Sequence, residues 1–205
     1  MEIEKITNLY PAQVKLKNEN TLNLRLMDEN DTKRIFDFFA GIPRQDKIYL
    51  KENVSSMATI DEWAHRINDK RAVTILGEID NNLCAEATLH QQSAGWSKHV
   101  GNIRINVTPE YRGLGIATVL CEKICWIARN INIEKIMAEV ILEQEIDIAI
   151  FQNLGFEKEA VLKDHVQDIE GRKHDLIILA NHTGNLLKEI HSHMLYTDPR
   201  FGNEY

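Results

Sequence analysis

The chain has 205 residues, 43% hydrophobic and 27% charged, which suits one globular domain with a core large enough to fold alone. Its 24 basic and 31 acidic residues give a net charge of −7, which argues against a nucleic-acid-binding surface. There is no signal-peptide pattern and no apolar stretch of the ~18 residues that a membrane-spanning helix needs, and the three cysteines indicate a reducing compartment. We therefore expect a cytoplasmic protein that contacts neither membrane nor nucleic acid.

The first half of the chain predicts two strand pairs separated by helices. Alternation of apolar and polar residues predicts four strands: 13–17, 21–27, 72–79 and 83–89. The turn Asp80–Asn82 joins the second pair. One helix is expected from Asp28 or Asn30, which are both good capping residues, to Gly41. Another is expected from Thr59 or Asp61, with Trp63 packed inward.

The second half predicts alternating strands and helices that end in a hairpin. The expected strands are 99–107, 135–142, 160–168 and 173–180, and the expected helices end near 129 and span 145–153. Antiparallel strands followed by a β-α-β-α-β-β order indicate a mixed sheet of the α+β class. Cys121 and Cys125 lie one helical turn apart in an apolar segment, so we interpret both as small core residues.

A glycine-bearing turn connects the strand that ends at Val107 to the apolar helix beyond it. The first N–H groups of a helix lack internal partners and lie at the positive end of its dipole. Gly113 and Gly115 let the backbone approach an anion closely, and Arg112 adds a planar cationic donor. The turn therefore predicts a phosphate or pyrophosphate site.

Two common phosphate motifs fit this turn poorly. A dinucleotide-binding fingerprint needs glycine or alanine where the chain has Thr118, and it usually lies in the first βα unit rather than past the middle of the chain. A P-loop needs Gly-Lys-Ser/Thr, and the sequence contains none. A nucleotide-binding oxidoreductase is thus the weakest of the alternative functions.

Arg112, Gly115 and Ala117 occupy the three defining positions of the R/Q-x-x-G-x-G/A loop, and the chain here resembles the GCN5-related N-acetyltransferase (GNAT) superfamily. The segments 138–140 and 148–156 resemble that family's fifth strand, following helix and Leu-Gly-Phe ending. The resemblance covers roughly residues 21–181 and implies a GNAT-like N-acyltransferase fold. Residues 1–20 would then be an N-terminal strand extension, and 182–205 a helical tail that packs on its own domain or forms a dimer contact.

The resemblance implies acetyl-CoA as co-substrate and an amine of a small molecule or peptide as acceptor, which attacks the thioester directly in a ternary complex. Backbone N–H groups from Leu114 to Thr118 would hold the pyrophosphate, the strand backbone would pair with the pantetheine, and an N–H of Val107 or Asn106 would polarise the thioester carbonyl. The implied cofactor-binding residues are Ile105, Asn106, Val107, Arg112, Gly113, Leu114, Gly115, Ile116, Ala117, Thr118 and Phe151.

The acid and the base of this reaction are less clear. Phe151 stands where the family often has a tyrosine acid, so that role is either moved or left to solvent. For the base, His99 titrates near neutral pH, whereas Glu86 would need its pKa raised by burial. Loss of the acid also leaves open a non-catalytic CoA-binding module that acts as a sensor or regulatory subunit.

The remaining expectations concern substrate, metal and assembly. The polar stretch 44–56, with Arg44, Lys47, Tyr49 and Lys51, would line the acceptor site, and Trp96 in the loop before the 99–107 strand would suit substrate contact. No metal site is expected, because the histidines that could suggest one fit a surface location better: His174, His182, His191 and His193. The protein would be a monomer or a homodimer.

Overall fold

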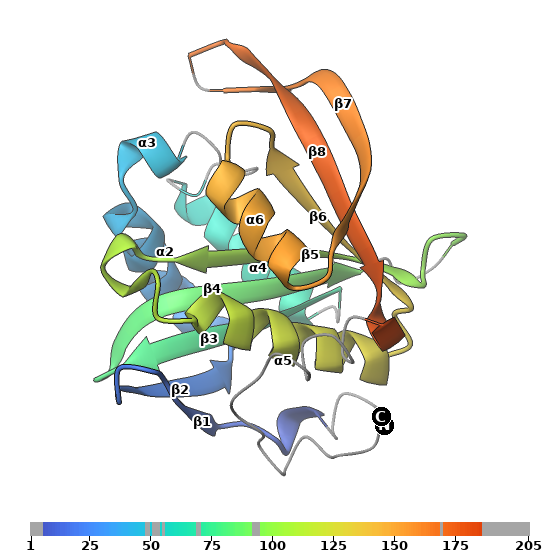
Figure 1. Cartoon of the computed structure of the whole chain (residues 1–205). Helices are drawn as coiled ribbons and strands as arrows, with labels where there is room; N and C mark the ends of the chain where they lie inside the picture. Colours follow the sequence, from blue (N-terminus) through green and yellow to red (C-terminus); the bar gives the residue numbers. More distant parts are fainter. Residues whose placement is uncertain are drawn as a thin grey trace.

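The computed structural model of the chain describes residues 6–47, 50, 54, 56–68, 71–91, 95–168 and 170–185. Within these residues eight strands form one mixed sheet in the order β1-β2-β3-β4-β5-β6-β8-β7 (Figure 1). The strands are β1 (Ala12–Lys15), β2 (Thr21–Leu26), β3 (Ala72–Ile79), β4 (Asn82–Gln91), β5 (Val100–Val107), β6 (Lys135–Ile141), β7 (Glu157–Gln167) and β8 (Lys173–His182). The helices are α2 (Thr32–Gly41), α3 (Arg44–Lys47), α4 (Met57–Asn68), α5 (Ile116–Asn130) and α6 (Glu145–Asn153), with 3-10 turns η1 (Glu29–Asp31) and η2 (Pro109–Tyr111).

The predicted α+β order is confirmed element by element. Only β5 and β6 pair in parallel, and the other neighbours are antiparallel. Asp80 and Asn81 both have positive φ, 50° and 64°, as a two-residue turn that matches the twist of β3 and β4 requires. Strand β1, from the N-terminal extension, joins the edge of the same sheet rather than standing apart.

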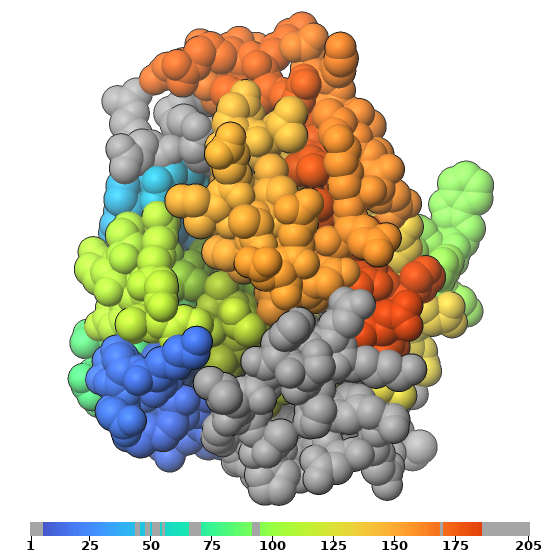
Figure 2. All heavy atoms as spheres, in the orientation of Figure 1, coloured from blue at the N-terminus to red at the C-terminus, as the bar shows by residue number. Residues whose placement is uncertain are grey.

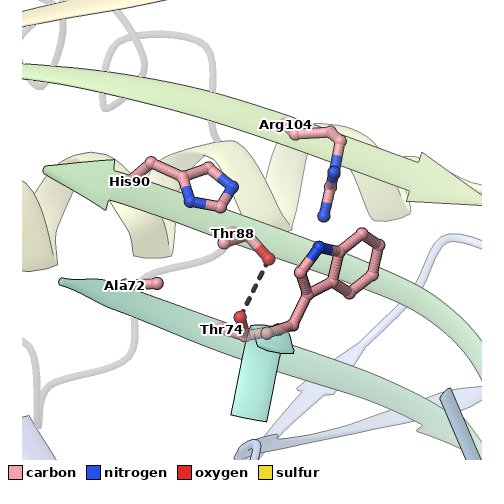
Figure 3. A pocket seen from close by; sticks show the side chains of 6 residues that line it. Ala72, Thr74, Thr88, His90 and Arg104 are labelled. Atoms are coloured by element: carbon pink, nitrogen blue, oxygen red, sulfur yellow. Dashed lines mark hydrogen bonds between the residues drawn. The ribbon is translucent and has the colours of Figure 1, made fainter. Parts of the chain in front are cut away.

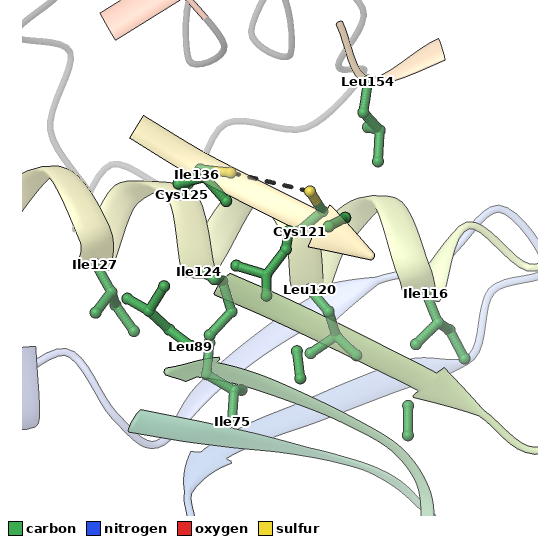
Figure 4. Close-up of a cluster of buried hydrophobic side chains, with 14 of the residues drawn as sticks. Ile75, Leu89, Ile116, Leu120, Cys121, Ile124, Cys125, Ile127, Ile136 and Leu154 are labelled. Carbon is green, nitrogen blue, oxygen red and sulfur yellow. Dashed lines mark hydrogen bonds between the residues drawn. The ribbon is translucent and has the colours of Figure 1, made fainter. Parts of the chain in front are cut away.

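Helices cover the two faces of the sheet in separate groups. Helices α5 and α6 lie on the near face in Figure 1, and α2 and α4 pack behind β3 and β4. Figure 4 shows how α5 is buried: Leu120, Ile124 and Ile127 lie against Leu89 of β4 and are fully inaccessible. On the other face Trp63 of α4 is 7% exposed and stacks edge-on against Phe39, which confirms its inward orientation. The start of α5 is therefore fixed relative to the sheet.

Gly101 allows the start of β5 to pack closely. A Cβ atom at this position would lie 2.6 Å from Cδ1 of Leu89 and 3.2 Å from Cγ2 of Ile133. Real Cβ atoms do not approach a carbon that closely, so any larger residue would force the packed side chains of Leu89 and Ile133 to shift. The glycine thus helps to set the position of the strand that leads into the candidate site.

All three cysteines lie in the core, as the sequence predicts for Cys121 and Cys125. The sulfur atoms of these two residues are 3.9 Å apart on α5. Burial raises the pKa of the Cys84 thiol to about 11, and burial together with the neighbouring Cys121 raises the pKa of Cys125. Neither Cys84 nor Cys125 is therefore activated for nucleophilic attack.

A few boundaries and segments differ from the expectations. Helix α3 was not predicted, α4 begins at Met57 rather than at 59 or 61, and β7 begins at Glu157, because tertiary packing extends elements beyond their local signals. The amphipathic pattern of the tail (186–195) lies outside the described residues, as do Tyr49 and Lys51. No helix in the described ranges is long and apolar enough to cross a membrane.

Candidate functional site

The segment after β5 turns sharply and starts α5 with a glycine. Gly113 and Gly115 have φ angles of +76° and +83°, a left-handed conformation that glycine adopts without steric cost. Gly115 directly precedes α5 and has no side chain that could cap the first N–H groups of the helix. A Cβ atom on either glycine would meet nothing within 4 Å, so these two positions of residues 112–118, the glycine loop, face open space, whereas Ile116 is buried.

The glycine loop combines the features of an anion site. Its N–H groups lie at the positive end of the 15-residue helix α5. Because that helix is buried along the sheet, the donors are held in place before any ligand arrives. Figure 2 shows the loop at the molecular surface, in yellow-green beside the orange-yellow residues of α6.

Strands β5 and β6 separate close to the glycine loop. Their parallel ladder pairs only 100–102 with 135–137, although β5 continues to Val107 and β6 to Ile141. The two strands therefore diverge toward their carboxyl ends. An extended ligand could enter this gap and pair with the free edge of β5 as an added strand does.

The register with β4 shows which N–H groups of β5 face this gap. Thr108 donates its N–H to the carbonyl of Cys84, and the ladder continues without a shift to Gly101. Since N–H directions alternate along an antiparallel strand, the Asn106 N–H points to β4, whereas those of Ile105 and Val107 point into the gap. Of the two N–H groups expected to polarise a carbonyl there, the geometry favours that of Val107.

Arg112 connects the glycine loop to the free edge of β5. Its Nε donates to the carbonyl of Val107 at 3.1 Å, and its Nη2 donates to Oδ2 of Asp46, on α3, at 2.7 Å. The guanidinium thus lies beside the gap between β5 and β6 with its charge already paired. Sequence reasoning gave no indication of Asp46 as a partner, because 66 residues separate the two.

Glu86 lies in a buried polar cluster on the sheet face that α2 and α4 cover. Only 1% of the residue is exposed. Its Oε1 accepts from Nδ2 of Asn106 at 2.6 Å and its Oε2 from Oγ1 of Thr88 at 2.8 Å, and Thr88 in turn lies 2.9 Å from Thr74. The carboxylate is thus satisfied by hydrogen bonds inside the fold, and neither the solvent nor an open cleft reaches it.

Arg104 continues this cluster toward α4 (Figure 3). Its guanidinium carbon lies 4.2 Å from the ring centre of Trp63, and its Nε lies 3.4 Å from Oε1 of Glu86. The pocket between Arg104, Thr88 and His90 has a volume of about 10 Å³, which is room for a single water molecule. The polar side chains of this cluster are therefore packed together and do not enclose a cavity large enough for a ligand.

Glu139 lies on β6 where the two strands begin to separate. Its Oε1 accepts from Nδ2 of Asn102, the last residue of β5 in the parallel ladder, at 2.9 Å. The neighbours Ala138 and Val140 pack in the core with α5, so the Glu139 side chain faces the opposite surface of the sheet. An open hollow of about 240 Å³ adjoins Asn102 and is lined by His90, Gln91, Ser97, Val100 and Gly101.

The structure places the other two predicted side chains, His99 and Phe151, on different elements. His99 is exposed in the turn before β5, where its carbonyl accepts from the N–H groups of Glu134 and Lys135. It precedes Asn106 by seven residues, a separation of about 23 Å along an extended strand. Phe151 is 8% exposed on α6 and stacks edge-on against Phe156, with ring centres 5.2 Å apart.

Three residues of this region were not identified as functional candidates from the sequence: Asp46, Arg104 and Glu139. A local signal existed for Glu139, which sits between apolar residues of a strand in the same way as Glu86. Lys47, predicted to line the acceptor site, donates to the carbonyl of Ala40 at 2.9 Å. Trp96, predicted to contact substrate, is 95% exposed.

Comparisons with known proteins agree with this geometry. The family model of the acetyltransferase (GNAT) family matches residues 36–156 of this chain, which begin within α2 and include the glycine loop, β6 and α6.

Solved structures give the same result over a larger part of the chain. The GNAT domain of S. lividans PAT is similar to this chain with a TM-score of 0.71 and 20% identity, over 83% of this chain and 96% of that domain. The putative acetyltransferase yncA from Salmonella typhimurium, solved with its cofactor acetyl-CoA, has a TM-score of 0.69 and 16% identity, over 79% and 94% of the two chains. A ribosomal-protein-alanine N-acetyltransferase from Brucella melitensis has a TM-score of 0.68 and 19% identity, over 78% and 98%. At these identities the likeness establishes a shared fold.

Proposed function

Because this chain belongs to the acetyltransferase (GNAT) family and is an N-acetyltransferase with acetyl-CoA as co-substrate, we propose that an amine of a small molecule or peptide attacks the thioester directly in a ternary complex. The observation that carries this proposal is the glycine loop, whose unpaired donors face open space beside the gap between β5 and β6. The two features together match an elongated ligand that ends in a pyrophosphate.

The chain offers main-chain groups for each part of acetyl-CoA. The N–H groups from Leu114 to Thr118 would hold the pyrophosphate. The edge of β5 at Ile105 would pair with the pantetheine amides, and the N–H of Val107 would donate to the thioester oxygen as negative charge develops on it. These roles depend on backbone direction and tolerate variation in the side chains.

We propose Glu139 as the group that takes the proton from the attacking amine. It lies on β6, two residues beyond the last residue that pairs with β5, on the sheet face opposite α5, from which an acceptor would approach. Glu86 is the alternative in the same region, although it would have to act through Asn106 because the acceptor cannot reach its buried carboxylate. His99, in the turn before β5, is the other alternative for this role.

The reaction then needs no dedicated acid. The amine nitrogen forms a bond to the acetyl carbon, the carbon–sulfur bond breaks, and the sulfur leaves with the electron pair. Glu139 accepts the proton of the ammonium group. The ring of Phe151 has no proton to give, so we propose that the CoA thiolate, a tolerable leaving group, is protonated by water.

The acceptor would reach Glu139 through the hollow beside Asn102. This hollow is large enough for a small side chain or a compact amine, and its described lining combines polar side chains with Val100 and Gly101 and contains no carboxylate, lysine or arginine. The exposed Trp96 ring stands in the adjoining loop. Solved relatives are named for different acceptors, spermidine and ribosomal-protein alanine among them, so the choice of acceptor belongs to each chain's own lining.

Calorimetric titration of acetyl-CoA tests the proposal. We expect the wild-type protein to bind with micromolar affinity, and Gly115→Trp to abolish binding because the indole would fill the space in front of the loop. Gly95→Trp is the matched control, since Gly95 also has a positive φ (+98°) and open space around it. Absence of wild-type binding would refute the site. Binding without CoA release for any of a panel of amines would favour the non-catalytic module.

A further inference from the structure

The ion pair between Arg112 and Asp46 joins the glycine loop to helix α3. The two charged groups are 2.7 Å apart, and the side chains of Arg112 and Asp46 are 53% and 27% exposed. The Nε of the same guanidinium is fixed on the carbonyl of Val107. Two donor nitrogens of Arg112, Nε and Nη2, therefore already form hydrogen bonds within the protein.

A pyrophosphate in the glycine loop would need this same fork. A guanidinium binds carboxylates and phosphates in similar two-point geometry, so the two anions are direct competitors for Arg112. The pairing thus opposes binding instead of assisting it.

A second carboxylate, that of Asp147, interacts electrostatically with both Arg112 and Asp46. Asp147 lies in the first turn of α6, and burial raises its pKa. The Arg112 charge lowers that pKa, and the Asp46 charge raises it further. Asp147 is therefore close enough to respond to both charges of the Arg112–Asp46 pair.

We propose that Asp46 is a positioning residue that acts on acetyl-CoA through Arg112. It holds the guanidinium while the site is empty, and the pyrophosphate displaces it when the co-substrate binds. Displacement breaks the contact between the glycine loop and α3, so that loading of acetyl-CoA releases α3 from the glycine loop. The proposal rests on the function proposed above, because it takes the glycine loop as the pyrophosphate site.

A double-mutant cycle measured by calorimetry tests this coupling. Asp46→Asn keeps the shape of the side chain and removes its charge, so we expect it to bind acetyl-CoA about two- to fivefold more tightly than the wild type, the range expected for a partly exposed ion pair. In an Arg112→Gln background the same change should have no effect, because the group through which Asp46 acts is gone. Asp37→Asn is the control, since it removes an equal charge from an exposed pair with Lys33 on α2.

Each result has one meaning. Equal tightening by Asp46→Asn in both backgrounds would show a general charge effect and overturn the coupling, as would no tightening in either. Failure of the wild type to bind would instead refute the glycine loop as the site, which separates the two proposals. Amide exchange at 44–47 gives a second readout: saturating acetyl-CoA should raise it in the wild type, and unchanged or slower exchange would contradict release of α3.

Discussion

Asn106 on β5 donates to Glu86 on β4 at 2.6 Å, and this bond ties the strand that would bind the co-substrate to the buried centre of the sheet. The two residues are directly opposite each other in the ladder. The carboxylate that the sequence marks as a possible base therefore has a structural role that can be measured separately from catalysis.

Replacement of Glu86 by alanine should destabilise the fold strongly. It would remove the carboxylate that accepts from Asn106 and Thr88 and that lies 3.4 Å from Nε of the partly buried Arg104, and loss of one partner of a buried pair costs about 3–5 kcal/mol. Urea unfolding measures this change. Glu159→Ala, which removes an exposed partner of Lys135, should alter the free energy of unfolding by less than about 1 kcal/mol. A Glu86→Ala protein with wild-type stability and no activity would instead assign Glu86 as the base.

Replacement of Glu139 by glutamine should remove the proton acceptor and leave the co-substrate site intact. The amide oxygen can still accept from Asn102, so we expect unchanged affinity for acetyl-CoA and a kcat about 10²–10⁴-fold lower. Steady-state kinetics with an accepted amine, together with calorimetry, separate the two quantities. His99→Gln serves as the comparison, and a larger loss of kcat in that variant than in Glu139→Gln would move the base to His99.

Introduction of a tyrosine at Phe151 should speed departure of the thiolate. The new hydroxyl group would supply the proton that the phenyl ring cannot, and the ring can keep its edge-on contact with Phe156. We expect a higher kcat with an unchanged affinity for acetyl-CoA, provided that chemistry limits the rate. A lower melting temperature without a gain in kcat would show that the hydroxyl is buried in the core without a partner. Phe156→Tyr, on the other ring of the pair, is the control for that packing cost.

His174 should make stability depend on pH. Its Nε2 lies 3.1 Å from Oδ2 of Asp168 and its Nδ1 3.1 Å from Oε1 of Glu143, so the ring links the β7–β8 hairpin to the loop before α6. Asp168 and then Glu143 raise the pKa of His174. Burial opposes ionisation of Asp168, but hydrogen bonds from His174 and Arg172 outweigh it and lower the pKa of that carboxyl. Asp168 therefore stays ionised over the whole range in which His174 titrates.

The direction of the effect follows from the raised pKa. Protonated His174 stabilises the fold fully below about pH 6.5, the value for histidine in an unfolded chain, and this contribution is lost as the pH rises through the raised value in the fold. The difference in melting temperature between wild type and His174→Gln should therefore be largest near pH 6 and shrink toward pH 8.5. His165→Gln, an exposed histidine on the same hairpin, is the control. A difference that grows with pH would contradict the assignment.

The parts of the site that sequence could predict are those set by local chemistry. The glycines at 113 and 115, the helix that follows and the apolar burial of that helix are all consequences of neighbouring residues, and the structure has them as expected. The hairpin turns and most of the element order follow from the same kind of signal. The residues proposed to bind the co-substrate through their backbone could therefore be identified from the spacing of the sequence motif alone.

The remaining parts depend on which strands meet. Nothing near Asn102 in the sequence indicates that its ladder with β6 stops there, and this divergence is what makes Glu139 and the Val107 N–H significant. The burial of Glu86 likewise depends on Asn106 and Thr88, which lie on the same face of the sheet as Glu86 once the strands have paired. The Asp46–Arg112 pair joins segments that are 66 residues apart in the sequence. Such contacts are properties of the assembled sheet.

The burial of all three cysteines has a practical consequence for enzymology. Cys84, Cys121 and Cys125 are inaccessible, and the pKa values of Cys84 and Cys125 are raised, so little thiolate is available to react with an electrophilic dye in the folded state. Free coenzyme A carries a thiol that becomes exposed only when the acetyl group has left. A chromogenic disulfide reagent should therefore report turnover continuously on the native enzyme, with a slow background that also signals any unfolding.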